Sequence, residues 1–193
     1  MKHLLVVFLS CTIQFSWAQS VTDNIFTLEE AREASPDSVF ALTLYKSKLT
    51  EFPVEILAYK NLRFLDVSKN KLTSIPLELN QLSSLKALNL GKNKLSTFPI
   101  ALCSMTHLEE LRLNENKINS IPECIKYFTE LHTLDLFETN ILSLPEELTL
   151  LKNLKNLDLR GMLYGPTFQA SWKEALPSAI IQFDSPCNCV EGN

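Results

Sequence analysis

A gapless 23-residue repeat constrains the fold of this chain more than any other feature. Its segments begin at Val39, Leu62, Leu85, Leu108 and Leu131, the fifth ends at Asn153, and a sixth, altered segment begins at Leu154. A fixed period of about 20 to 50 residues is typical of a solenoid, in which each unit packs mainly against its neighbours. The repeat therefore predicts stacked coils rather than a globular fold built around one central core.

Apolar residues occupy the same positions of every repeat. Positions 1, 4 and 6 are apolar throughout, as Leu85, Leu88 and Leu90 illustrate in the third segment. Positions 4 and 6, with mostly polar neighbours, give the alternation of a half-buried strand. Positions 11, 14 and 18 are also apolar, so each coil points side chains inward from all sides. One coil cannot bury them alone, and stacking is required.

Asparagine and proline recur where each coil turns. Position 9 is Asn70, Asn93 and Asn116 in the middle repeats, and it changes to Ser47, Thr139 and Met162 in the others. A buried carboxamide can serve the inward-facing backbone groups of a turn, so we expect a stacked Asn ladder. Position 15 is always proline, which predicts a short helical turn on the outer side: Pro53, Pro76, Pro99, Pro122 and Pro145.

The pattern LxxLxLxxNxLxxLPxxLxxLxx resembles the leucine-rich repeat family over about four-fifths of the mature chain. The resemblance implies an α/β fold: a right-handed horseshoe arc with a parallel β-sheet on its concave face and short helical or 3-10 turns on its convex face. Bacterial secreted leucine-rich repeat proteins are similar in their ends as well. The family also implies a non-catalytic scaffold that recognises a protein or peptide on the concave sheet.

Residues 1–18 have the layout of a secretory signal peptide. Lys2 and His3 form a positive start, an apolar run follows from Leu4 to Phe15, and small residues precede a cut after Ala18. The run is shorter than the roughly 20 residues that a membrane span needs. We therefore expect a secreted, periplasmic or cell-surface protein. Lipid attachment at Cys11 is the alternative.

The mature chain is mildly acidic. Removing residues 1–18 removes one lysine, which leaves 17 basic against 22 acidic residues and a net charge of −5. This balance argues against a general nucleic-acid or anionic-membrane binder. The remaining composition suits a soluble protein, which we expect to be a monomer.

Both ends of the repeat array read as caps. In residues 19–38, Thr27 and Glu30 form a capping box that predicts a helix from Leu28 to Ala34. Residues 154–193 combine a degenerate last repeat with a C-terminal cap. There, glycines and a proline interrupt the repeat, and we expect a helix over Thr167–Leu176 and a last strand over Ala179–Phe183. Trp172 is interpreted as part of the core of this cap.

The cysteines outside the leader fall into two pairs. Cys103 and Cys124 lie at positions 19 and 17 of adjacent repeats, and the two-residue offset favours two free thiols over a disulfide. Cys187 and Cys189 lie near the C-terminus. A local disulfide or two free thiols are the simpler interpretations of this pair, and a metal site is the alternative.

No catalytic constellation is visible in the sequence. After the leader only His107 and His132 remain, and the repeat places no Ser or Cys beside either of them. The chain has four glycines and no phosphate-binding loop, and its carboxylate pairs are adjacent rather than convergent. We expect no enzyme activity, no cofactor and no metal.

The predicted binding face consists of positions 3, 5 and 7, which point out of the concave sheet. Aromatic and arginine side chains dominate interface hot spots, and exposed aromatics are unusual on a water-facing sheet. We therefore predict a binding site at Tyr45, Phe64, Asp66, Arg112, Asn114 and Phe137. Alternatively, Phe64 and Phe137 only cover neighbouring side chains, as cross-strand aromatics do.

A lysine-rich rim follows the strands at positions 8 and 10: Lys46, Lys48, Lys69, Lys71, Lys92, Lys94 and Lys117. Such a rim could bind an anionic glycan or cell-envelope polymer, or it could only keep an exposed loop edge soluble. A purely structural or accessory module is the third interpretation of the chain.

Overall fold

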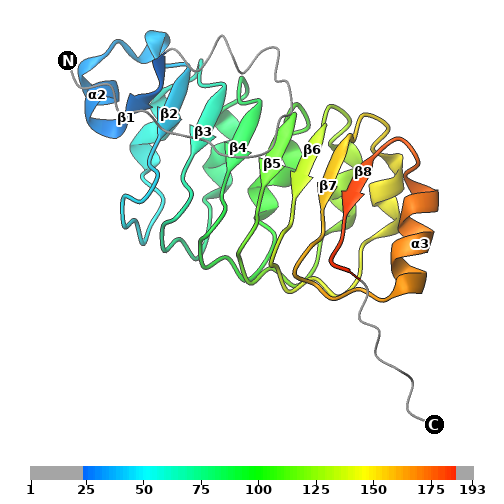
Figure 1. Cartoon of the computed structure of the whole chain (residues 1–193). Helices are drawn as coiled ribbons and strands as arrows, with labels where there is room; N and C mark the ends of the chain where they lie inside the picture. The colour runs from blue at the N-terminus through cyan, green and yellow to red at the C-terminus, as the bar shows by residue number, and fades with distance from the viewer. Residues whose placement is uncertain (1–23, 186–193) are drawn as a thin grey trace.

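The computed structural model describes residues 24–185. The signal peptide, Cys11 and the Cys187–Cys189 pair lie outside these residues. Within them, the strands form one parallel sheet in the order of the chain (Figure 1). The strands are β1 (Phe26–Thr27), β2 (Ala41–Thr43), β3 (Phe64–Asp66), β4 (Ala87–Asn89), β5 (Glu110–Arg112), β6 (Thr133–Asp135), β7 (Asn156–Asp158) and β8 (Ile180–Gln182).

The sheet register equals the repeat length. Leu65 pairs with Leu88, Leu88 with Leu111, and the same 23-residue step continues from β2 to β7. Those leucines are at most 1% exposed and form one continuous core with the apolar positions of the other sides. The stacked solenoid that the repeat predicts is confirmed.

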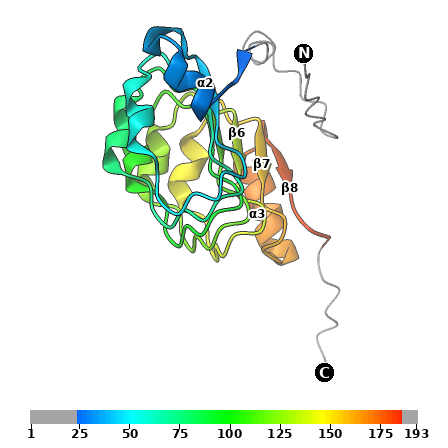
Figure 2. The same ribbon diagram turned by 90° about the vertical axis from the view of Figure 1, so that its left-hand side faces the viewer.

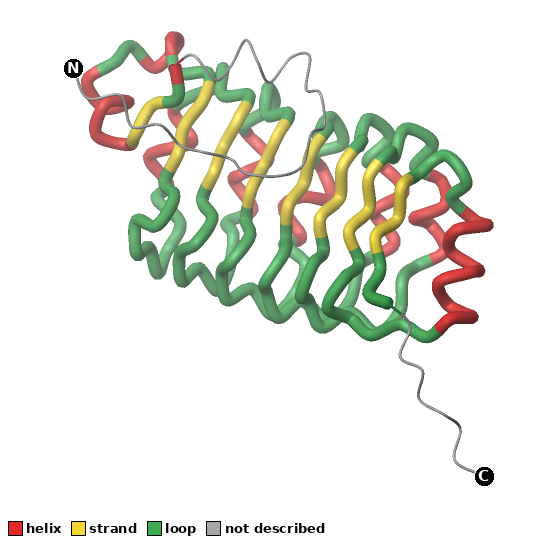
Figure 3. Tube along the Cα trace, in the orientation of Figure 1, coloured by secondary structure: helices red, strands yellow, loops and turns green. Residues whose placement is uncertain are grey.

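Short 3-10 helices lie on the opposite side of the solenoid from the sheet (Figure 2). Each begins directly after the position-15 proline, as predicted, because proline fixes φ and lacks the N–H that a helix start leaves unused. Figure 3 shows how strand, loop and helix alternate around each coil. These helices are η3 (Val54–Ala58), η4 (Leu77–Gln81), η5 (Ile100–Ser104), η6 (Glu123–Tyr127) and η7 (Glu146–Leu150).

The Asn ladder is confirmed. The Asn93 carboxamide accepts from the Leu72 N–H at 3.0 Å and donates to the carbonyls of Val67, Leu90 and Gly91. Asn70 and Asn116 repeat the pattern in the flanking coils. One side chain thus joins backbone groups of neighbouring turns that would otherwise be buried without partners.

The N-terminal cap consists of β1, α2 (Leu28–Glu33) and the 3-10 helix η2 (Pro36–Ser38). The predicted capping box is present: the Glu30 carboxylate accepts from the Thr27 N–H at 2.8 Å, and the Thr27 hydroxyl accepts from the Glu30 N–H. The helix ends one residue before the predicted bound. The sequence did not predict β1, which pairs with β2 and covers the first edge of the repeat sheet.

The C-terminal cap consists of α3 (Pro166–Ala175) and β8, each within one or two residues of its predicted bounds. Tyr164 stacks on Phe168 with ring centroids 3.9 Å apart, and Phe183 meets both rings edge-on. Trp172 is half-buried against the core, as predicted. Figure 1 shows that α3, which carries Phe168 and Trp172, lies at the C-terminal end of the stack of coils.

The prediction of free thiols at Cys103 and Cys124 is wrong. The two form a disulfide that joins η5 to η6 across adjacent coils, with Cα atoms 5.5 Å apart. Both cysteines lie within the 3-10 helix of their coil, so an offset of two residues in the repeat still leaves their Cα atoms close enough to pair. This separation lies within the range that a disulfide requires.

Candidate functional site

The candidate site is the outer surface of the sheet, formed by positions 3, 5 and 7 of β2–β7 and the residues that follow them. We call this surface the sheet face. The leucines between these positions point into the core, so every second side chain is left on the surface. The sheet face spans six strands in unbroken 23-residue register (Figures 1 and 3).

Three aromatic side chains on the sheet face remain accessible. Tyr45, directly after β2, is 44% exposed. Phe64 is half-buried in β3, where its register partners are the small residues Ala41 and Ala87. Phe137 is half-buried after β6, and the Arg160 guanidinium lies 5.3 Å from its ring centroid. Phe64 therefore has no bulky neighbour on either adjacent strand to cover it.

Position 5 has a structural role that the sequence interpretation missed. Asp66 is 8% exposed and accepts from the Ser68 N–H at 2.8 Å. The same bond, from a position-5 side chain to the N–H two residues later, recurs at Thr43, Asn89, Asp135 and Asp158. Asp, Asn and Thr are residues that make such local turns. The position-5 oxygens hold the strand ends, so Asp66 presents little of itself to a partner.

Arg112 breaks this position-5 pattern. Its guanidinium pairs instead with Glu110 on the same strand. Two residues further on, the Asn114 side chain lies over Gly91 of the neighbouring coil, where a Cβ on Gly91 would collide with Asn114 Oδ1. The absence of a side chain at Gly91 therefore provides the space that the Asn114 side chain occupies.

The pKa of Asp135 on the sheet face is raised above its ordinary value. Burial raises its pKa to about 6, the neighbouring Asp158 adds to the increase, and the hydrogen bond from the Phe137 N–H opposes it. Asp135 and Asp158 are register partners on β6 and β7, which brings the two carboxylates side by side. This part of the sheet face consequently changes charge in mildly acidic solution.

The lysine-rich rim meets the sheet face at Tyr45. Lys69 Nζ donates to the Tyr45 hydroxyl at 2.7 Å and lies 5.0 Å from the ring centroid, while Lys46 Nζ lies 5.2 Å from it. The hydrogen bond from Lys69 lowers the pKa of Tyr45 from its usual value. The two position-8 lysines adopt left-handed backbone, with φ of 57° and 54°.

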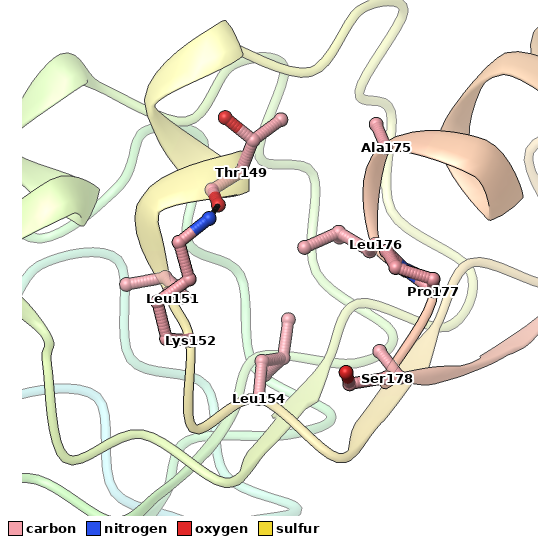
Figure 4. A pocket seen from close by; sticks show the side chains of 9 residues that line it. Thr149, Leu151, Lys152, Leu154, Ala175, Leu176, Pro177 and Ser178 are labelled. Atoms are coloured by element: carbon pink, nitrogen blue, oxygen red, sulfur yellow. Dashed lines mark hydrogen bonds between the residues drawn. The ribbon is translucent and has the colours of Figure 1, made fainter.

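Beyond the sheet face, the described residues contain a shallow pocket but no candidate metal cluster. In residues 24–185, no group of three or more His, Cys, Asp or Glu side chains is placed to hold a metal ion. A shallow pocket of about 110 Å³ lies between the last full repeat and the C-terminal cap (Figure 4). Its walls are mostly aliphatic, with Leu151 and Leu154 facing Leu176 and Pro177, so it lacks a cluster of reactive groups.

The comparisons with known proteins agree with this geometry. The family description "Leucine rich repeat" matches residues 60–118. A leucine-rich repeat protein of Leptospira interrogans is 32% identical, with a TM-score of 0.66 over 75% of this chain and 36% of that one. Internalin C2 of Listeria monocytogenes shares the fold at 22% identity, with a TM-score of 0.63 over 75% of this chain and 61% of that one.

A third similar structure is the ectodomain of the Arabidopsis thaliana membrane receptor kinase GASSHO1/SCHENGEN3, solved in complex with CASPARIAN STRIP INTEGRITY FACTOR 2. It is 30% identical, with a TM-score of 0.56 over 67% of this chain and 16% of that one. The chain thus spans about a third of the Leptospira protein and about a sixth of the plant ectodomain. The search of curated protein sequences found no match.

Fold, register and similarity together define a solenoid of stacked leucine-rich coils with one open parallel sheet. The chain is a leucine-rich repeat protein. Over residues 24–185, no helix has the length and apolar character needed to cross a membrane.

Proposed function

We propose that this protein is an exported, non-catalytic recognition module that binds another protein or a peptide on its sheet face. The carrying observation is the set of accessible aromatic side chains, Tyr45, Phe64 and Phe137, on a surface where strands otherwise present small or hydrogen-bonded residues. Exposed aromatics are costly on a water-facing sheet and supply much of the binding energy of interfaces. The protein acts as a monomer in this proposal.

The contacts of the six predicted residues suggest different contributions. Phe64 and Phe137 offer apolar area, and Tyr45 offers a ring together with a hydroxyl. Arg112 and Asn114 are half-buried, and Arg112 is oriented by its ion pair with Glu110, so both can supply polar contacts. Asp66 supports the strand end. The plant ectodomain, solved in complex with CASPARIAN STRIP INTEGRITY FACTOR 2, supports a ligand-binding role for this fold.

The Cys103–Cys124 disulfide supports export. Disulfides persist in oxidising compartments and are rare in the cytosol, and this one joins two coils of the array. The signal-peptide layout of residues 1–18 points the same way. N-terminal sequencing of the protein recovered from its native cells tests this: we expect Gln19 as the first residue. If the recovered protein begins at Met1, export is contradicted. If it begins at a lipid-modified Cys11, the protein is anchored to a membrane rather than released.

Binding is tested with a Phe64→Asp/Phe137→Asp variant. Extracellular proteins and peptides captured by the wild-type chain are identified by mass spectrometry, purified, and titrated against each variant by calorimetry. The matched control is Leu77→Asp/Ile100→Asp, which adds the same charges to two exposed apolar residues on the 3-10 helix side. Circular dichroism verifies that both variants are folded.

Loss of binding in the sheet-face variant, with binding retained by the control, supports the proposal. The proposal fails if the folded sheet-face variant binds as tightly as wild type. An equal loss of binding in both variants also contradicts the proposal, because the loss would then come from the added negative charge and not from the sheet face.

A further inference from the structure

Two lysines converge on Tyr45 without a carboxylate partner among the described residues. The Nζ atoms of Lys46 and Lys69 lie 5.2 and 5.0 Å from the centroid of the Tyr45 ring, and no described acidic group forms an ion pair with either. Other cations near the sheet face are neutralised: Lys92 pairs with Glu115, Arg112 with Glu110 and Arg160 with Asp158. Positive charge is therefore concentrated, unpaired, beside one exposed aromatic ring.

The sheet face is also divided by charge along the solenoid. At positions 3, 5, 7 and 8, the coils of β2–β4 carry three lysines against one aspartate, whereas those of β5–β7 carry five carboxylates against two arginines. The first set is Lys46, Lys69, Lys92 and Asp66, and the second is Arg112, Arg160, Glu110, Glu115, Asp135, Glu138 and Asp158. A ligand that crosses the face thus meets opposite charges at its two ends, which fixes its orientation.

From this convergence we infer that the N-terminal half of the sheet face binds an acidic segment of a protein, with a carboxylate between the Lys46 and Lys69 ammonium groups and an apolar side chain on Phe64. This inference rests on the proposed function and names the partner class for it. Two ammonium groups can each donate a charge-assisted hydrogen bond to one carboxylate. Phe64 is half-buried between the small, buried register partners Ala41 and Ala87, and the accessible part of its ring offers an apolar contact one strand away.

A protein segment fits this surface better than a long polyanion. The mature chain is acidic overall, and the excess of five carboxylates over two arginines in the β5–β7 half repels a ligand that is negative along its whole length. An apolar contact beside the lysines also favours a ligand with mixed side chains. The lysines at Tyr45 therefore suit a local acidic patch in an otherwise varied sequence.

The test is selection from a phage-displayed library of random peptides against the full chain. The selection is repeated on Lys46→Gln/Lys69→Gln, on the charge-matched control Lys94→Gln/Lys117→Gln, and on Phe64→Asp/Phe137→Asp. Selected peptides are then synthesised and titrated. We expect wild type and control to enrich peptides rich in Asp and Glu. The Lys46→Gln/Lys69→Gln variant should bind those peptides at least about tenfold more weakly, since it loses two charge-assisted contacts.

The alternative outcomes separate the two proposals. Selected peptides that depend on Phe64 and Phe137 but show no acidic preference overturn this inference and leave the proposed function standing. If the binding of no selected peptide depends on Lys46 and Lys69 or on Phe64 and Phe137, both the acidic-segment inference and the proposed function are refuted. A parallel titration with polyphosphate overturns the acidic-segment inference if it binds through Lys46 and Lys69 while no acidic peptide is enriched.

Discussion

Replacing Thr139 by asparagine should stabilise the protein by extending its Asn ladder by one coil. The ladder ends at Asn116, and Thr139 occupies the next position 9. Among the described residues, the buried Ile118 N–H has no hydrogen-bond acceptor, and the Leu113 carbonyl accepts only from Asn116. In the preceding coil, the equivalent groups, Leu95 N–H and Leu90 O, both bond to Asn116.

The magnitude follows from these two groups. A new carboxamide would accept from the Ile118 N–H and add a donor to the Leu113 carbonyl, while its Nδ2 replaces the bond that the Thr139 hydroxyl donates to the Leu136 carbonyl at 2.9 Å. Each net buried hydrogen bond contributes about 1 kcal/mol. After the rotamer entropy of the asparagine is subtracted, we expect a gain of about 1 to 2 kcal/mol in the free energy of unfolding.

Urea denaturation followed by circular dichroism measures the effect. Thr139→Asn should raise the midpoint at constant m-value, and the control Thr139→Val, which keeps the shape but loses the hydroxyl, should lower it. Amide exchange adds a local readout, since the Ile118 N–H should exchange more slowly in the asparagine variant. If Thr139→Asn is no more stable than wild type and the Ile118 amide exchanges at the same rate, the ladder reasoning is refuted.

Three further perturbations test other parts of the structure. Gly161→Ala should cost more than about 1 kcal/mol of stability in thermal denaturation, because the residue has φ of 87° and the new Cβ would meet Glu138 Cγ at 2.7 Å. The control Gly165→Ala should be near neutral, because a Cβ at Gly165 meets no atom within 4 Å. Reduction of the Cys103–Cys124 disulfide should lower the free energy of unfolding by about 3 kcal/mol, since it closes a loop with a sequence separation of 21; an unchanged urea midpoint in reductant would contradict this. The folded-state pKa of Asp135 is raised to about 6, so between about pH 4 and 6 the folded chain binds a proton that the unfolded chain does not, and the stability contributed by this group falls as pH rises through that window. Asp135→Asn should therefore flatten the profile of denaturation midpoint against pH. An unaltered slope would show that burial does not raise the pKa of Asp135.

Most of the fold could be predicted from the sequence because the repeat determines it locally. Each Leu at position 4 contacts its counterpart one coil away, so a single register accounts for β2–β7. The caps depend less on the repeat. β1 contains only Phe26 and Thr27, too short for a recognisable alternation, and its place follows from docking on β2. The Cys103–Cys124 disulfide was missed because an offset of two residues within the 3-10 helices does not by itself report the distance between the two Cα atoms, which is 5.5 Å.

The candidate site was predicted less completely than the fold. Alternation placed Tyr45, Phe64 and Phe137 on the sheet face, and the structure leaves all three accessible. It did not reveal that Asp66 caps a strand end, although Asp or Asn two residues before a turn is the signal that could have shown it. The left-handed backbone at Lys46 was also hidden, because lysine gives little indication of that conformation.

Site-specific photo-cross-linking would locate the binding surface most directly. A photoreactive phenylalanine analogue is placed at position 64, on the sheet face, or at position 77, on the 3-10 helix side, and the protein is irradiated at the surface of its native cells. If the sheet face binds a protein partner, position 64 gives a discrete cross-linked species and position 77 does not. A cross-link from position 77 alone, or none from position 64 in a folded and exported chain, contradicts recognition by the sheet.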